Sequence, residues 1–310
     1  MSSLLSRAKL ASQPGGRPPV AVEIAPHGVL AATSPGHGQP PVFAFEPLPA
    51  GALLPGIADQ NLHSAEAVAT AIRTVLSQLA PRTRAITLIV PDAVVRVFLL
   101  DFDTLPTRAA EAVPVLRFRL RKMVPFDVEH AGVSYQVLSE TKTECRVVAA
   151  VIPGPVLAEY EAAVRAAGYE PGAILSSSLA ALAAIETEEP VLAANLGAEA
   201  ITTSITHGQD LLLYRTLDLP EDPRLHLQEV QRGIAVAAAY YEDKLGERPR
   251  MLYYAGIGAG GPNAAEDFAR WLDDPQLTVT SLAPRPETGA ATTLGNLSLA
   301  GVTGALAGAA

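Results

Sequence analysis

The chain has 310 residues, enough for two domains, and its composition of 49% hydrophobic and 18% charged residues excludes an intrinsically disordered protein. A net charge of −9 argues against a general nucleic-acid binder. The single cysteine, Cys145, excludes an intrachain disulfide and fits a reducing compartment. It lies in the strand-like stretch CRVVAAVIP, so we expect a buried apolar side chain and no nucleophile.

The chain begins with MSSLLSRAKLASQPGGRPP, which has no apolar core of signal-peptide length. We expect residues 1–18 to be a disordered leader, and a short membrane-surface helix is the alternative. Residues 20–33 then alternate and break at Pro26, His27 and Gly28, which predicts a strand, a turn and a second strand. The stretch PPVFAFEPLP, residues 40–49, predicts a further strand.

A helix is predicted at residues 64–79, where Ser64 is a suitable N-cap and Val68, Ile72 and Val75 recur at helical spacing. Two apolar strands follow, at residues 85–92 and 94–106. The next helix is predicted at residues 107–124. Pro114 inside it produces a kink or marks its true first turn, because proline is tolerated only near a helix start.

This helix ends in an apolar corner, in the stretch RLRKMVPFD, where most helices end in Gly or Asn and a polar loop. Leu116, Leu120 and Val124 form one apolar stripe, and Arg117 lies on a neighbouring row with Arg121. The helix stops at Val124 because the residue before a proline is pushed out of the α region.

The next segments are a strand hairpin at residues 132–140 and 145–153, a helix at 155–168, and a strand edge running into a small-residue helix at 173–186. We expect the serines at 176–178 to cap that helix. From residue 190 the first pattern restarts, as strand, Gly turn, strand, turn and strand, which indicates a weak internal duplication. A helix at 225–245, a strand and Gly-rich turn at 248–261, a helix at 263–272, a strand at 277–284 and a buried helix within 294–310 complete an α/β chain.

Four segments resemble the actin-like pilus assembly proteins of the PilM family and the related cytoplasmic domain of GspL from type II secretion. They are VAVEIAPHGV, PVLRFRLRKMVPFDVEHAGVSYQVL, LAANLGAEAITTSITHGQDLLLYRTLDL and LQEVQRGIAVAAAYYEDKLGERPRMLYYAG. LAGVTGALAG near the end resembles the closing helix of the family, so the resemblance spans residues 20–308. The second and fourth segments are the specific ones, because many actin-like and sugar-kinase chains share the hairpins.

The resemblance implies an α/β, actin-like (ribonuclease H-like, duplicated) fold of two domains, with a small inserted subdomain and a truncated second-domain insertion. The first domain would span residues 19–188, with the inserted subdomain at about 94–150, and the second domain residues 189–284. Residues 285–310 would be a linker and a closing helix that returns to the first domain. The truncation follows from residues 219–225, because most of a subdomain lies in this interval in full-length relatives.

In the family, the Pro-Phe corner closes the helix of the inserted subdomain, which borders a groove for the tail of a partner. The resemblance therefore implies that a partner binds at Arg117, Arg121, Val124, Pro125 and Phe126. The alternative for Val124 and Phe126 is that they fill the junction between subdomains.

The family resemblance also implies a nucleotide site, formed by two phosphate hairpins and a Gly turn, with carboxylates that place a metal. Here Glu23 replaces the usual Asp, Pro26 removes an N–H donor, and Asn195 replaces the second Asp. We therefore predict a degenerate site with no catalytic residue, no metal and no cofactor; ATP and Mg²⁺ binding is the alternative. The residues expected at this site are Glu23, Asn195, Gly197, Ala198, Gly256 and Gly258.

The function implied is a cytoplasmic scaffold of a type IV pilus or type II secretion-like platform, reaching the inner membrane only through partners. Its partner would be a PilN-like inner-membrane protein with a cytoplasmic N-terminal tail, together with a cytoplasmic motor ATPase. The alternative is an ATP-binding switch or weak ATPase of the same machine.

Two enzyme classes are further alternatives. The stretch GIGAGG at residues 256–261 matches a dinucleotide-binding fingerprint, but the next strand lacks the acid that would bind the ribose. A sugar kinase would need a general base. The candidate bases, each expected to be a solvated cap, are Asp92, Asp101, Asp103 and Asp127.

Overall fold

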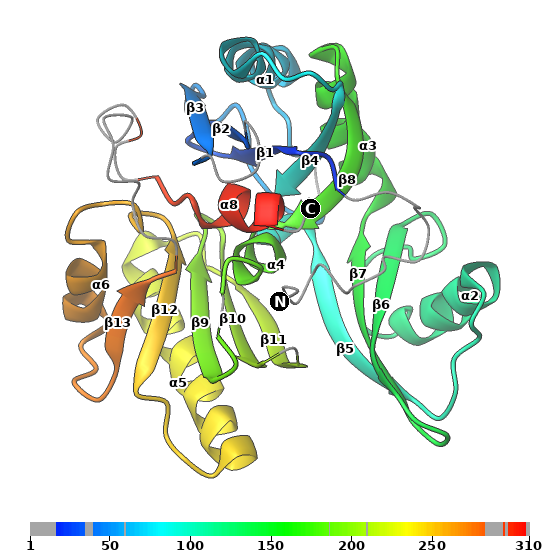
Figure 1. The fold of residues 1–310 in the computed structure, drawn as a ribbon, viewed down its shortest axis with the longest axis vertical. Helices are drawn as coiled ribbons and strands as arrows, with labels where there is room; N and C mark the ends of the chain where they lie inside the picture. The colour runs from blue at the N-terminus through cyan, green and yellow to red at the C-terminus, as the bar shows by residue number, and fades with distance from the viewer. Residues whose placement is uncertain are drawn as a thin grey trace.

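The computed structural model describes residues 17–34, 40–58, 60–185, 187–208, 210–282, 294 and 297–307. Most of the predicted leader, residues 1–16, and most of the predicted linker lie outside the described residues. The described part contains three β-sheets, two of five strands and one of three (Figure 1).

The two five-stranded sheets have the same topology, which confirms the duplication predicted from the hairpins. In each sheet three antiparallel strands are followed by two parallel ones. The first sheet has the order β3 (Val42–Pro47), β2 (Gly28–Thr33), β1 (Val20–Ala25), β4 (Ala85–Val90) and β8 (Glu170–Ser176). The second has the order β11 (Asp210–Asp218), β10 (Ala200–His207), β9 (Pro190–Leu196), β12 (Met251–Gly256) and β13 (Thr278–Ser281).

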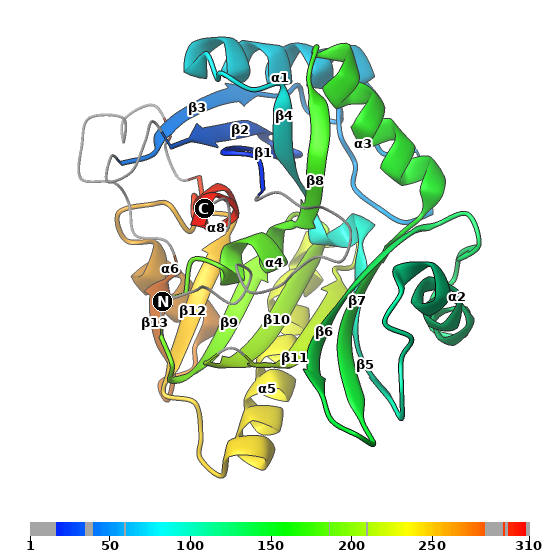
Figure 2. The same cartoon turned by 45° about the vertical axis from the view of Figure 1, so that its right-hand side comes forward.

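Helices occupy equivalent places after the strands of each half. In the first half they are α1 (Ala65–Leu79), α3 (Gly154–Ala166) and α4 (Ser177–Leu182); in the second they are α5 (His226–Leu245), α6 (Ala264–Leu272) and α8 (Ala300–Ala307). α1 and α3 cover the outer face of the first sheet, while α4 and α8 lie between the two sheets (Figures 1 and 2). Between β11 and α5 only residues 219–225 intervene, including the short 3₁₀ helix η2 (Pro223–Leu225), so the second-domain insertion is indeed truncated.

The side-chain alternation of β1 decides which residues face each layer. Val20, Val22 and Ile24 are buried in the cluster that includes α1, whereas Ala21 belongs to the cluster that includes α8. Because successive strand residues point to opposite faces, Glu23 also points toward α8. A Cβ placed on Gly301 of α8 would lie 2.5 Å from a Glu23 carboxylate oxygen, so the helix backbone approaches this side chain closely.

A third sheet is inserted between β4 and α3 of the first half. It has the strand order β5 (Arg96–Phe102), β7 (Cys145–Ile152) and β6 (Gly132–Glu140), all antiparallel, and α2 (Ala109–Leu120) covers it. Leu116 and Leu120 of the predicted stripe are buried against the sheet together with Ala112 and Cys145, whereas Val124, the third member of the stripe, is half-buried beyond the end of α2. The regular helix is shorter than expected at both ends, since it runs from Ala109 to Leu120, so Pro114 lies in its second turn. The prediction that Pro125 ends the helix at Val124 is wrong, because turns already replace the helix from Arg121 onward.

Candidate functional site

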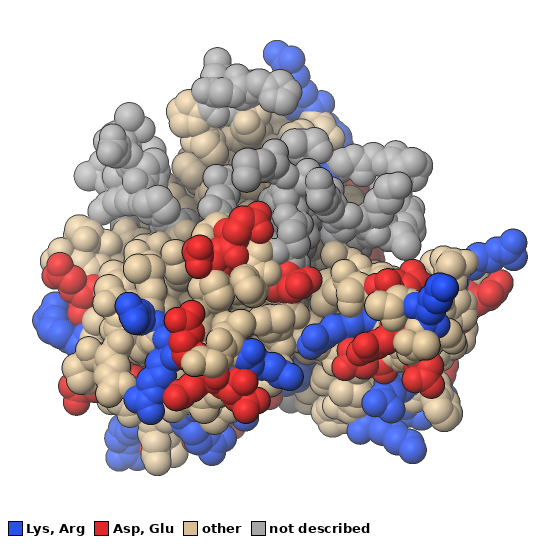
Figure 3. Space-filling view, turned by 60° about the horizontal axis from the view of Figure 1, so that its bottom comes forward, with Lys and Arg blue, Asp and Glu red and all other residues tan. Residues whose placement is uncertain are grey.

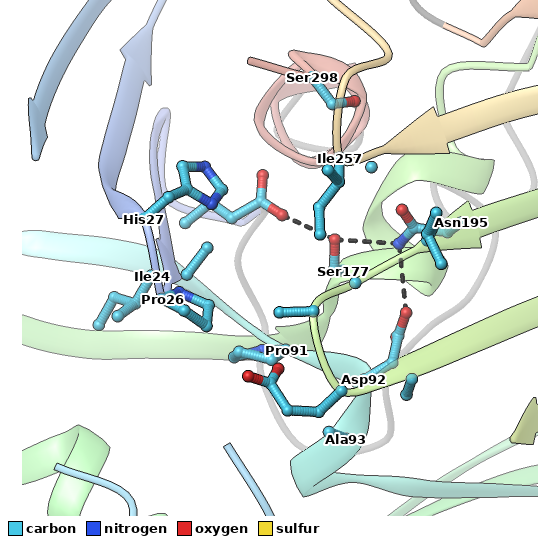
Figure 4. A pocket seen from close by; sticks show the side chains of 18 of the residues that line it. Ile24, Pro26, His27, Pro91, Asp92, Ala93, Ser177, Asn195, Ile257 and Ser298 are labelled. Atoms are coloured by element: carbon cyan, nitrogen blue, oxygen red, sulfur yellow. Dashed lines mark hydrogen bonds between the residues drawn. The ribbon is translucent and has the colours of Figure 1, made fainter. Parts of the chain in front are cut away.

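A cavity of about 410 Å³ lies between the two halves of the molecule. Its walls are the turn of the β1–β2 hairpin, the turn of the β9–β10 hairpin, the turn after β12, the 3₁₀ helix η1 (Asp92–Val94) after β4, and residues 297–298 before α8 (Figure 4). All six residues expected at the nucleotide site line it: Glu23, Asn195, Gly197, Ala198, Gly256 and Gly258. Among the described residues, those that line the cavity include Glu23, Asp92 and Glu199 but neither Lys nor Arg.

A hydrogen-bond network at the base of this cavity joins the two halves. The amide of Asn195, on β9, donates to Asp92 Oδ2 over 3.2 Å and to Ser177 Oγ over 3.1 Å. Ser177 in turn donates to Glu23 Oε1, on β1, over 2.6 Å. Figure 4 shows Asn195 placed between Ser177 and Asp92. The amide in the second half therefore links two acids of the first half.

Asp92 is the centre of this network, and the expectation that it is a solvated cap is wrong. Its side chain is buried, and it accepts hydrogen bonds from the Ser178 backbone N–H and hydroxyl and from Tyr214 Oη at 3.2 Å. Ser176 Oγ lies 3.0 Å from Tyr214 Oη and also accepts from Leu179 N, so the predicted cap at the start of α4 is confirmed. No local pattern in the sequence indicates the contact with Tyr214, because β11 lies far along the chain.

Burial controls the protonation of the acids in the cavity. It raises the pKa of Glu23 to about 7; the charge of Asp92 adds to this effect, and the Ser177 hydrogen bond opposes it. Burial also raises the pKa of Asp92, although its hydrogen bonds from Ser178 and Tyr214 favour the charged form. For Glu199, burial raises the pKa to about 7. The cavity is thus acidic and poorly solvated.

The glycine turn after β12 is fixed against the second hairpin. Gly256 has φ +97°, and a Cβ there would lie 2.1 Å from the carbonyl oxygen of Leu196, so only glycine fits. The N–H of Ile257 donates to the same carbonyl over 2.8 Å. α6 begins only at Ala264, and the turn belongs to the duplicated sheet described above, so GIGAGG is no dinucleotide-binding fingerprint.

The residues that line the cavity are poorly suited to bind a nucleotide with Mg²⁺. The first turn carries Pro26, which has no N–H, and the N–H of Gly197 in the second turn is bonded to the carbonyl of Ala200 over 2.8 Å. Asp92 and Asn195 are hydrogen-bonded to each other, and the lining residues that the structure describes supply no cation for a phosphate. Among the described residues no group of three or more His, Cys, Asp or Glu could hold a metal ion.

The predicted partner corner lies after α2, on the inserted sheet. The Arg117 guanidinium donates to the carbonyls of Val128, Glu129 and Ala131, so its role is to hold the loop that follows the corner. Val124 and Phe126 are half-buried against the core of the inserted sheet. Arg121, paired with Glu129, and Pro125 remain exposed.

The other acids considered as bases lie outside the cavity. Asp101 is exposed and faces Arg146 at 3.6 Å, and Asp127 is exposed and pairs with His130 at 2.5 Å. Asp103 is exposed as well. None of the described helices combines the length and apolar content needed to cross a bilayer.

No protein-family model matches the sequence, and no curated protein matches it. A chain of the PilM–PilN type IV pilus biogenesis complex is 18% identical, with a TM-score of 0.70 over 94% of this chain and 98% of that one. A Bacteroides thetaiotaomicron protein with an actin-like ATPase fold and unknown function is 10% identical, with a TM-score of 0.51 over 86% of this chain and 91% of that one.

The cytoplasmic domain of EpsL, an inner-membrane component of the type II secretion system of Vibrio cholerae, is 14% identical, with a TM-score of 0.49 over 89% of this chain and 91% of that one. At these identities the first two matches establish the fold. The duplicated sheets, the inserted three-stranded sheet and the two structural matches together show that this chain has the actin-like fold, as its resemblance to the PilM family implied.

Proposed function

We propose that this chain is a scaffold of a type IV pilus or type II secretion-like assembly platform, which binds the cytoplasmic N-terminal tail of an inner-membrane partner. The likeness to a chain of the PilM–PilN complex, over nearly the full length of both chains, supports the pilus system. The network of Glu23, Ser177, Asn195 and Asp92 supports a scaffold role, because it uses the polar groups of the cavity to join the two halves.

This network is the observation that carries the proposal. An actin-like switch moves its halves in response to nucleotide, so its cleft residues must be free to bind phosphates and a metal. Here the Asn195 amide donates to residues of the first half, and Asp92 also accepts from Tyr214 of the second. A nucleotide would have to break these buried bonds, and each broken bond leaves a polar group unpaired. We propose that the nucleotide site is degenerate and that the chain is no enzyme.

Calorimetric titration of the folded chain with Mg-ATP tests the degenerate site. We expect no saturable heat even at millimolar ATP, because the cavity presents acids and no cation to the phosphates. Saturable heat at micromolar ATP would overturn this part of the proposal and favour the ATP-dependent switch. Circular dichroism of the same sample shows whether the protein is folded.

The partner tail is proposed to bind beside the corner that follows α2. Arg121 and Pro125 are exposed there, whereas Arg117 is committed to the carbonyls of the loop. A direct test is binding of a synthetic N-terminal tail of the PilN-like protein to the chain and to a variant with Arg121→Glu and Pro125→Asp. We expect the variant to lose binding, while Arg232→Glu on α5, also exposed, retains it. Unchanged binding in the double variant would reject this location.

A further inference from the structure

The outward face of α2 carries apolar side chains that no part of the described chain covers. Phe118 has 69% of its surface exposed, the highest value among the exposed large apolar residues, and Val115 has 37%. Lys122 follows four residues after Phe118, so the three side chains lie on one side of the helix and its final turn. The buried side of the same helix is Ala112, Leu116 and Leu120.

The surroundings of this face are basic, in contrast to the acidic chain as a whole. Residues 107–124 contain five Lys and Arg but one acid, Glu111, in a chain of net charge −9. Glu111 pairs with Arg108, and Arg121 pairs with Glu129. No ion pair is found for Arg119 or Lys122 among the described residues. Two exposed cations therefore flank Phe118 without an acidic partner in the part of the chain that the structure describes.

Such a local excess of cations is not general on the molecule. On the face shown in Figure 3, Lys and Arg side chains lie among Asp and Glu side chains and form no field of one sign. α2 itself lies at the outer margin of the molecule, with the inserted sheet on its inner side (Figures 1 and 2). Nothing in the described chain prevents a flat surface from reaching it.

We propose that the outward face of α2, formed by Val115, Phe118, Arg119, Lys122 and Met123, contacts an anionic lipid surface. A convex helix face with an exposed aromatic ring between cations matches the interfacial region of a bilayer, where the ring enters the headgroup layer and the cations meet phosphates. Met123, 41% exposed, extends the apolar part. The inference goes beyond the expectation that this chain meets the membrane only through partners.

The biological setting of this contact rests on the proposed function. A partner anchored in the inner membrane, bound at the corner beside α2, would hold this face within one tail length of the bilayer. A weak lipid contact then gains from a high effective concentration, and it would orient the scaffold as well as hold it.

The contact can be tested with the full chain and vesicles, without any partner. Wild-type protein should co-sediment with vesicles that contain phosphatidylglycerol, bind less to pure phosphatidylcholine, and dissociate as salt is added. Phe118→Ser combined with Lys122→Glu should lower the partition coefficient about tenfold, because it removes the aromatic anchor and reverses a charge. Val137→Ser on β6 is the matched control, since Val137 is 41% exposed on the same insertion and should not contribute.

Three results would overturn the proposal: no preference of the wild-type chain for anionic vesicles, equal binding by the double variant, or an equal loss in the Val137→Ser control.

The tail peptide, titrated into the same variants, separates this proposal from the scaffold function. Tail binding should be unchanged in the Phe118 and Lys122 variant. Loss of tail binding with vesicle binding retained would instead identify the face as a protein interface. Absence of tail binding in wild type, with vesicle binding present, would reject the scaffold and leave the lipid contact standing.

Discussion

The hairpins β1–β2 and β9–β10 are equivalent parts of the two halves, yet they contribute opposite polar groups to the same cavity. β1 carries the half-buried acid Glu23, followed by a turn with Pro26, whereas β9 carries the buried amide Asn195, followed by a turn with Gly197. The strand order is the same in both sheets. The two hairpins have therefore kept the same backbone arrangement, while their polar residues differ. Glu23 in the first half accepts a hydrogen bond, and Asn195 in the second half donates hydrogen bonds.

The halves also differ in what has been inserted. In the first half the sheet β5–β7–β6 and α2 lie between β4 and α3, while in the second half only residues 257–263 separate β12 from α6. The inserted sheet returns to contact the second half through Arg96 of β5 and Asp218 of β11, whose side chains are 2.7 Å apart. The insertion thus adds the exposed corner after α2 to the first half. It also adds an ion pair to the second half, besides the hydrogen bonds of Asn195.

The largest expected effect comes from making the second hairpin acidic like the first. Asn195→Asp would place a carboxylate where the amide donates to Asp92 over 3.2 Å, so a hydrogen bond becomes a repulsion between buried acids. We expect the free energy of unfolding to fall by about 4 kcal/mol. The loss should be greater at higher pH, because the buried acid must then be charged. Urea unfolding at two pH values measures it.

The exchange of the two residues is the control for that variant. Asp92→Asn combined with Asn195→Asp restores one acid and one amide, and it should recover part of the lost stability. If the double variant is as unstable as the sum of the single variants, the two side chains do not act as a pair.

The second prediction concerns the equivalent helices α4 and α8, which pack against each other between the two sheets. A Cβ on Gly304 would lie 1.9 Å from the carbonyl oxygen of Ala180, so Gly304→Ala must push the helices apart. We expect a loss of about 3 kcal/mol in the free energy of unfolding. Gly56→Ala is the control, because a Cβ at Gly56 meets nothing within 4 Å. Thermal unfolding measures both variants, and equal melting temperatures would contradict the close packing of α4 against α8.

The third prediction makes the first hairpin neutral like the second. Burial raises the pKa of Glu23 to about 7 in the folded protein, above the ordinary value of 4.5 for a glutamate side chain. The stabilisation by the protonated form is complete below the unfolded pKa and is lost as the pH rises through about 7. Glu23→Gln avoids this loss and should exceed wild type by about 2 kcal/mol near pH 8.

Urea unfolding checks this prediction when it is measured at several pH values between the pKa of Glu23 in the unfolded chain and its pKa in the folded protein. The difference between Glu23→Gln and wild type should grow with pH, whereas Glu140→Gln on the exposed end of β6 should follow wild type throughout. A constant difference at all pH values would show that Glu23 keeps an ordinary pKa.

The smallest effect is expected at the link between the insertion and the second half. Asp218 is 62% exposed, so its ion pair with Arg96 is well solvated. Asp218→Asn should lower the free energy of unfolding by about 0.5 kcal/mol, and added salt should remove the difference. Asp210→Asn, exposed on the same strand, is the control and should have no effect. A loss equal to that of Asn195→Asp would mean that the insertion is essential to joining the halves.

The fold could be predicted from the sequence because its signals are local. The break at residues 26–28 and the Gly turn after Asn195 each mark a hairpin, and the repeated pattern indicated a duplicated α/β chain. The resemblance then placed Glu23 and Asn195 at one cavity, where the structure brings them together.

The role of Asp92 could not be predicted in the same way. A Pro-Asp pair after a strand has the pattern of a solvated cap, and burial at this site depends on Tyr214 and Ser178, which come from distant elements. Arg117 has the spacing of an exposed basic row, yet its guanidinium donates hydrogen bonds to the carbonyls of residues 128, 129 and 131. Long-range contacts of polar groups leave no periodic trace in a sequence.

The place of α8 has a consequence for how the protein is made. Leu299, Val302 and Ala305 complete an apolar cluster with Ala21, Leu30 and Ala32, from the first strands of the chain. During synthesis these strands emerge long before the helix that covers them, so their inner face stays exposed to solvent while the second half is translated. Folding that depends on such distant contacts is slow, and the nascent chain is vulnerable to aggregation. A chaperone that covers this face until α8 leaves the ribosome would therefore act on the first half alone.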